Sequence, residues 1–179
     1  MQPNNILSLL DAEHSALGSI AAGVDLAHAL EHLLLSLESQ SDEAMHACLV
    51  LIDDADRFCG LSAPNLPQDL CLALRHGGEQ PSPFSAAAFS GAPVYCGDIT
   101  RDLQWSAGRM EAMLHGYRAG WVAPVFGASG HILGVLGLLF QAPCHPTQPE
   151  IDLLALAARA ASHVIERGQL EKSLRDSRE

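Results

Sequence analysis

Two apolar runs within residues 121–140 constrain the fold more than any other part of the sequence. A Gly-Ala-Ser-Gly break at 127–130 separates them, which predicts a β-hairpin. The second run, Ile132–Phe140, is apolar on both faces and is interrupted only by glycines, so it predicts a strand at the centre of a sheet covered on both sides. Gly134 and Gly137 indicate positions where another group packs close to the backbone.

Shorter patterns predict the remaining elements. Strands are expected at 47–52, 57–63 and 93–96, and helices at 5–21, 26–38, 66–74, 84–91, 106–116 and from Glu150 to about Glu179. Asp25 is the expected N-cap of the second helix, and Ser82 or Ser85 that of the fourth. A polar break at 39–43 and a Gly/Pro-rich loop at 75–83 interrupt these patterns.

The charge balance excludes some partners. The formal net charge is -11, with 21 acidic and 10 basic residues, and Lys172 is the only lysine. This composition offers no basic stripe, so nucleic acid is not an expected partner. No uncharged run reaches the roughly 18 residues of a membrane span, and the first five residues lack the basic start of a signal peptide. We therefore expect a cytoplasmic domain without a membrane partner.

Cysteine and histidine spacings predict neither disulfides nor a metal site. The five cysteines contain no Cys-x-x-Cys pair, and we expect most of them to be reduced, small apolar residues. His28 and His32 form the only local spacing typical of metal ligands, and solvated helix histidines explain that pair more simply.

The last predicted helix changes character after Glu166. Beyond that point only Leu170 and Leu174 are apolar. They continue a heptad seam through Leu156, Ala160, His163 and Arg167. This pattern predicts a two-stranded coiled coil with a second copy of the chain, leading into an output domain beyond this sequence. A frayed tail is the alternative.

Several motifs in this order resemble the GAF family of sensory domains. The resemblance covers about residues 20–168 and includes Val24-Asp-Leu, Phe89-Ser-Gly-Ala-Pro-Val with Asp98-Ile, and Trp105. It continues with the segment Gly116–Val125, with Gly-His-Ile-Leu-Gly-Val-Leu from Gly130, and with the helix that begins at Glu150.

The resemblance implies an α+β fold. It implies a central antiparallel sheet of five to six strands, with terminal helices that dimerise on one face and a ligand pocket with short helices on the other. The corresponding division is an N-terminal helix at 1–22, a GAF domain at 23–168 and the start of a coiled-coil linker at 169–179. That linker resembles those entering PAS or diguanylate cyclase modules, which implies cyclic-di-GMP signalling, or less often a histidine kinase.

The chain departs from three specialised GAF patterns. Ser82-Pro-Phe-Ser85 stands where bilin-binding members carry Gly-Ser-Cys-Gly. The Asn-Lys and Asp-Glu motif of cyclic-nucleotide-binding members is missing, and the three-cysteine pattern of free methionine sulfoxide reductases is incomplete. We therefore expect no catalytic residues and no enzymatic activity.

The implied pocket lies between the sheet and residues 75–120. Its predicted ligand-binding residues are Phe84, Ser85, Phe89, Tyr95, Trp105, Met110, Met113, His115, Tyr117 and Trp121. An aromatic set with few polar groups suits a small, flat or weakly polar ligand.

Three other functions stay open at this point. One is a haem or metal gas sensor with His115 or His76 as axial ligand. Another is thiol catalysis by Cys48, Cys59 or Cys96, although no neighbouring base is evident from spacing. The last is a dimerisation module without a ligand.

Overall fold

A computed structural model describes residues 3–41, 44–77 and 80–179 of the chain. Residues 1–2, 42–43 and 78–79 lie outside this description, and with them parts of the chain start, the polar break and the Gly/Pro-rich loop considered above. The strands are β1 (Met45–Ile52), β2 (Phe58–Ser62), β3 (Val94–Cys96), β4 (Ala119–Phe126) and β5 (Ile132–Phe140). They form one antiparallel sheet in the order β2-β1-β5-β4-β3, which confirms the predicted sheet.

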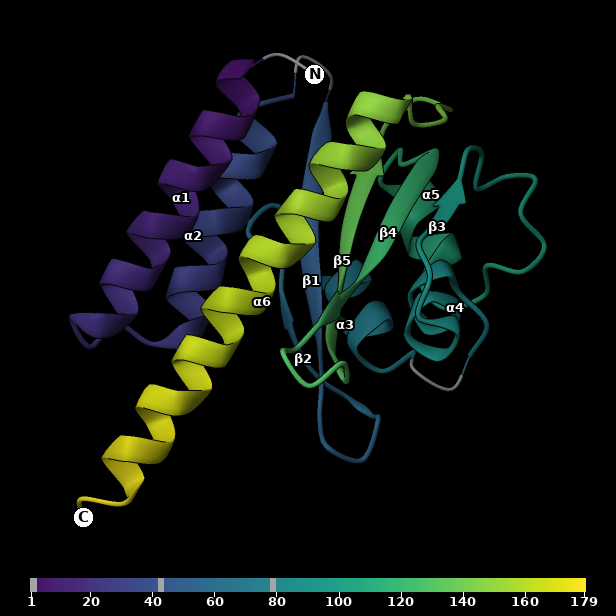
Figure 1. Cartoon of the computed structure of the whole chain (residues 1–179). Helices are drawn as coiled ribbons and strands as arrows, with labels where there is room; N and C mark the ends of the chain where they lie inside the picture. The colour runs from purple at the N-terminus through teal and green to yellow at the C-terminus, as the bar shows by residue number, and fades with distance from the viewer. Residues whose placement is uncertain (1–2, 42–43, 78–79) are drawn as a thin grey trace.

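Helices cover both faces of this sheet (Figure 1). On one face lie α1 (Pro3–Ala21), α2 (Leu26–Ser39) and α6 (Gln148–Asp176), whose apolar side chains share a core with every second residue of the strands. On the other face lie α3 (Gln68–Arg75), α4 (Pro83–Ser90) and α5 (Arg109–Leu114), with a second core. Terminal helices and short helices therefore occupy opposite faces, as predicted.

The glycines of β5 allow close packing at the centre of the sheet. β5 pairs with β1 on one side and β4 on the other, as its two-sided apolar pattern predicts. A Cβ at Gly137 would lie 2.6 Å from the Phe84 ring of α4. A Cβ at Gly134 would lie 2.4 Å from the Val50 carbonyl oxygen of β1. Both predicted close approaches are confirmed.

Side-chain caps fix where the helices begin. The Asp25 carboxylate accepts a hydrogen bond from the His28 amide at 3.0 Å, as predicted for the N-cap of α2. Ser82 caps α4 in a reciprocal capping box with Ser85, so the two predicted alternatives act together. α6 begins two residues before the predicted Glu150, because Thr147 and Glu150 form its capping box.

The C-terminal turns of α6 extend past the α1–α2 connection (Figure 1). At Gly168 the helix α6 still packs closely against α2, since a Cβ there would lie 2.8 Å from Leu26. Beyond it Leu170 and Leu174 are 52% and 45% exposed. Within the domain, however, α1 already covers the predicted heptad seam: Ala160 is buried in the core and His163 pairs with Glu13 of α1 at 2.5 Å. The last turns of α6 thus offer a short apolar seam to a second copy, and α1 exposes two further leucines, Leu7 and Leu10.

None of the helices within the described parts of the chain is both long and apolar enough to cross a membrane.

Candidate functional site

Three of the predicted ligand-binding residues fill the core beneath the short helices. Phe84, Trp105 and Tyr117 are at most 2% exposed. A Cβ at Gly120 would lie 2.9 Å from the Trp105 ring, so the indole lies directly against β4. Its Nε1 donates a hydrogen bond to the Ala107 carbonyl at 2.7 Å. These side chains occupy the space that the resemblance assigned to a pocket.

Tyr117 also forms a polar pair inside this core. Its hydroxyl lies 2.5 Å from Nδ1 of His46 in β1, and the two rings meet edge to face. Burial raises the pKa of Tyr117 to about 12, with the Glu38 carboxylate as the next cause. The phenol is therefore neutral at physiological pH and ties the start of β4 to β1.

Tyr95 and Trp121 lie on the opposite face of the sheet. They are cross-strand partners on β3 and β4, and both pack with the core under the terminal helices. Trp121 Nε1 donates to the Cys144 carbonyl at 3.1 Å, and its ring lies 4.2 Å from that of Phe140. The structure therefore separates these two residues from Trp105 by the sheet itself.

The α5 candidates lie on the outside of the short-helix layer. Met110 and Met113 are 73% and 41% exposed. His115, at the end of α5, has its Nε2 2.8 Å from the Asp69 carboxylate of α3. His76 is exposed at the end of α3. Neither histidine of the haem hypothesis points into the core, and the described residues contain no group of three or more potential metal ligands.

Ser85 and Phe89, two of the predicted residues, line an open cavity on the short-helix side of the sheet. It has a volume of about 480 Å³ and lies between α4, the β1–β2 turn and the β4–β5 turn. We call it the α4 cavity. Phe58, Phe89 and Phe126 form aromatic walls, and Ile52 and Ile132 contribute side chains from the sheet. It lies on the predicted face of the sheet, but at its end rather than beneath the short helices.

Polar and apolar atoms contribute about equally to the surface of the α4 cavity. Its polar side chains are those of Asp56, Ser85, Ser90 and His131. The Ser85 hydroxyl is already engaged in the α4 cap. Phe89 is 96% exposed, so its ring is free to close over a bound molecule. This surface suits a flat ligand that is held by aromatic contact and carries polar groups of its own.

The β4–β5 turn connects the α4 cavity to α6. Phe126 lines the cavity, and its carbonyl oxygen accepts a hydrogen bond from Ser162 Oγ of α6 at 2.5 Å. Two residues later the Ala128 amide donates to the Glu166 carboxylate of α6 at 2.8 Å. Gly130 and His131 return from the turn to the cavity wall. The β4–β5 turn thus contacts both the cavity and the long C-terminal helix.

Sequence reasoning missed most of the cavity wall. The sequence predicts Phe58, Phe126 and Ile132 only as strand residues, and it predicts no binding role for Asp56 or His131. A usable signal was present at Phe126, an aromatic residue that ends a strand directly before a glycine-rich turn. Strand ends and turns at one edge of a sheet converge in space, and loops positioned in this way commonly carry binding residues.

Four of the five cysteines show no activation as nucleophiles. Burial raises the pKa of the Cys48 thiol far above its usual value and that of Cys96 to about 12. Burial also raises the pKa of Cys59 and Cys71. A catalytic thiol requires the opposite shift, because the thiolate is the nucleophile.

Comparisons with known proteins agree on the fold. The chain is 27% identical over 176 residues to the methyl sulfide methyltransferase-associated sensor of Methanosarcina acetivorans, covering 94% of the chain but only 17% of that protein. The GAF domain of a phosphoenolpyruvate-protein phosphotransferase from Coxiella burnetii superimposes with a TM-score of 0.68 at 15% identity, covering 94% of this chain and 99% of that one.

An enzyme shares the same fold. Free methionine-R-sulfoxide reductase from Neisseria meningitidis superimposes with a TM-score of 0.64 at 15% identity, over 95% of both chains. A family profile for the GAF domain matches residues 23–166. With that match and this architecture, the chain belongs to the GAF domain family.

Proposed function

We propose that this GAF domain is a sensory module that binds a small, flat molecule in the α4 cavity and relays its presence through α6. The observation that carries the proposal is the double role of Phe126. Phe126 lines the cavity, and its backbone carbonyl accepts a hydrogen bond from Ser162 of α6. The sensor name of the Methanosarcina relative supports the same class of function.

Relay requires that the ligand bind two states with different affinity. A molecule between Phe89 and Phe126 favours a position of the β4–β5 turn that closes the cavity. Because Ser162 and Glu166 hold that turn, its movement favours a corresponding position of α6. The exposed turns beyond Gly168 carry the change out of the domain.

The receiver of the signal is a downstream module of a longer protein. The chain spans 17% of the length of its Methanosarcina relative, so most of that protein lies outside the matched region. We propose that residues 169–179 begin a parallel coiled coil between two copies in the cytoplasm. It would lead to a diguanylate cyclase, with or without a PAS module, or to a histidine kinase.

The protonated state of the buried thiols favours a domain that binds its ligand without catalysing a reaction. The sulfoxide reductase shares the fold, but here burial holds Cys48 and Cys96 in the protonated form. Haem would require a histidine directed into a cavity, whereas His115 lies against Asp69 on the outside. A haem titration without a Soret band is the expected result.

A thermal-shift screen of flat aromatic and heteroaromatic compounds tests the proposal. A compound present at 100 times its Kd adds about 2.7 kcal/mol to the free energy of unfolding. Phe89→Ser removes an exposed wall of the cavity and is expected to abolish the stabilisation. Leu103→Ser is the matched control, because Leu103 is 85% exposed outside the cavity. The proposal is wrong if no compound stabilises the chain, or if Phe89→Ser responds like the wild type.

A dimerisation module without a ligand is the second candidate. The exposed pair Leu170 and Leu174 favours it, because the pair offers a seam independent of any cavity. A dimer whose stability no compound changes would support this candidate over the sensor.

A further inference from the structure

The edge strand β2 is open to pairing. Among the described strands β2 pairs with β1 alone, and its outer edge faces away from the sheet. The strand reads Phe-Cys-Gly-Leu-Ser and contains neither a charge nor a proline. Natural edge strands use such residues to prevent further pairing. β2 therefore presents unpaired backbone groups with no charge or proline inside the strand, although it is short and its pairing with β1 shifts register at Leu51/Ile52.

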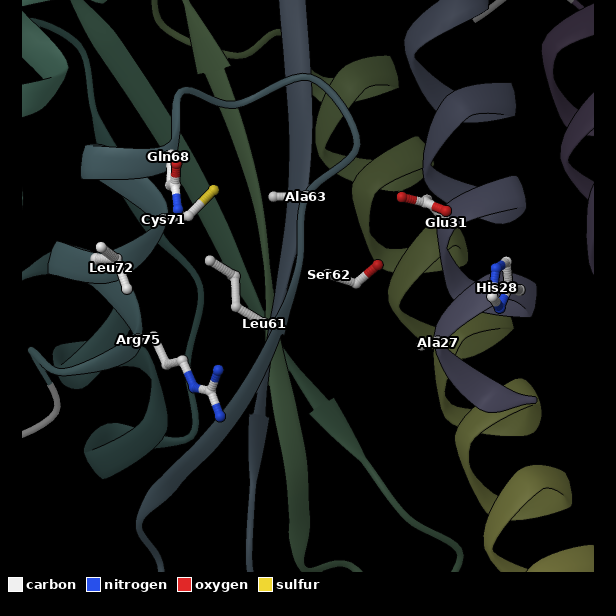
Figure 2. A pocket seen from close by; sticks show the side chains of 10 residues that line it. All are labelled: Ala27, His28, Glu31, Leu61, Ser62, Ala63, Gln68, Cys71, Leu72 and Arg75. Carbon is white, nitrogen blue, oxygen red and sulfur yellow. The ribbon is translucent and has the colours of Figure 1, made fainter.

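A groove with two walls runs along this edge. It has a volume of about 440 Å³. Figure 2 shows Leu61 and Ser62 of β2 between Glu31 on α2 and Cys71 on α3. We call it the β2 groove. Because side chains alternate along a strand, Leu61 faces the α3 wall while Ser62 faces the α2 wall.

The two walls differ in charge and polarity. Glu31 projects from the α2 wall and Arg75 from the α3 wall (Figure 2). Neither forms an ion pair within the described parts of the chain. Next to Arg75, the α3 wall carries Leu72, Cys71 and Gln68, and Leu61 of β2 faces it. The groove thus presents the Glu31 carboxylate beside His28, which pairs with Asp25, on one side, and a largely apolar surface with one guanidinium on the other.

We propose that the β2 groove binds an extended peptide segment of a partner protein, which pairs with β2 as an additional strand. The residues of this segment that face α2 are basic, and those that face α3 are aliphatic apart from one carboxylate near Arg75. Main-chain hydrogen bonds to β2 provide affinity, and the two walls provide specificity. The formal net charge of -11 further favours a basic segment.

A second copy of this chain does not fit the groove. If two β2 strands paired edge to edge, the α2 helices of the two copies would lie next to each other on one face of the joined sheet, and the α3 helices on the other. These helices form the groove walls, so they would meet before the strands could pair. A single extended segment of about five residues, roughly 17 Å long, has no such helices and enters freely.

A synthetic peptide tests the proposal on the full chain. The probe is fluorescently labelled Gly-Lys-Val-Lys-Glu-Lys-Val-Gly, whose lysines share one face and whose valines and glutamate share the other. We expect saturable binding by fluorescence polarisation and slower hydrogen exchange of the amides at 58–63. Methylation of the six central backbone nitrogens is expected to abolish binding, because it removes the strand hydrogen bonds.

Charge variants test the assignment of the walls. Glu31→Lys is expected to weaken binding about fivefold, the effect of losing an exposed ion pair and gaining repulsion. A peptide with lysine and glutamate exchanged is expected to prefer the double variant Glu31→Lys/Arg75→Glu. Asp176→Lys, in the exposed end of α6, is the matched control and leaves the affinity unchanged.

Four results would overturn the proposal. They are the absence of saturable binding, equal binding of the methylated peptide, protection of amides outside the groove, and an affinity that does not change in Glu31→Lys. Concentration-dependent self-association that Glu31→Lys abolishes would instead assign the groove to a second copy.

Discussion

At the scale of single residues, Phe126 and Ser162 connect the cavity to the output helix. Ser162 is one of two buried polar residues identified in the described chain, and its hydroxyl donates to the Phe126 carbonyl. A hydrogen bond of this kind contributes about 1 kcal/mol to stability. The pair therefore holds the β4–β5 turn on α6, while breaking this one contact when the turn moves costs little free energy.

Ser162→Ala tests this connection. We expect the free energy of unfolding to fall by about 1 kcal/mol, because the hydrogen bond to Phe126 is lost. The measurement is urea denaturation. Ser177→Ala is the matched control, since Ser177 Oγ donates only to the Leu174 carbonyl in the exposed tail. Equal stability of the two variants would argue against a structural role for the Ser162 contact.

Tyr117 gives a pH dependence with a defined sign. Its pKa is raised from 10 to about 12 by burial, so the folded state favours the neutral phenol. The resulting stability is fully present below pH 10 and is lost between about pH 10 and 12. We expect Tyr117→Phe to flatten the stability curve in this window, measured by denaturation at several pH values. A curve as steep as that of the wild type would contradict the assignment.

At the scale of elements, β5 and α4 depend on a glycine at their contact. Gly137→Ala would place a Cβ 2.6 Å from the Phe84 ring, and crowding of this kind typically costs about 1 to 3 kcal/mol. Gly18→Ala in α1 is the control, because no atom lies within 4 Å of its Cβ position. There we expect stabilisation by up to about 1 kcal/mol. Denaturant midpoints distinguish the two, and destabilisation by Gly18→Ala would contradict this packing argument.

The elements were predictable from the sequence because their signals are local. Asp25 and Ser82 mark helix starts through hydrogen bonds within three residues, and the glycines of β5 mark its central position. The site was less predictable, because face and depth depend on tertiary packing. The sequence shows two tryptophans, Trp105 and Trp121. Only the folded structure shows that they pack in the cores on opposite faces of the sheet.

At the scale of the whole molecule, the account requires α6 to act beyond its domain. The seam at Ala160 and His163 is occupied by α1, so within α6 the exposed leucines left to carry a coiled coil are Leu170 and Leu174. Because short coiled coils are marginal, this short seam agrees with the proposal that the helix extends into a further module.

Sedimentation of two lengths of the chain tests this requirement. The chain through Glu179 is expected to dimerise, and a chain ending at Glu166 to be monomeric, because the latter keeps the Ala128 contact but loses both leucines. Leu170→Glu/Leu174→Glu in the full-length chain is expected to give the monomer as well. A dimer that survives both changes would assign the interface to another surface.

Hydrogen exchange with and without the most stabilising compound of the thermal-shift screen tests the central claim most directly. The account predicts altered protection in α4 and the β4–β5 turn, together with a change in α6 around 162–166, and predicts that Ser162→Ala weakens the change in α6. Protection confined to the cavity, with α6 unaltered, would contradict a relay through this helix.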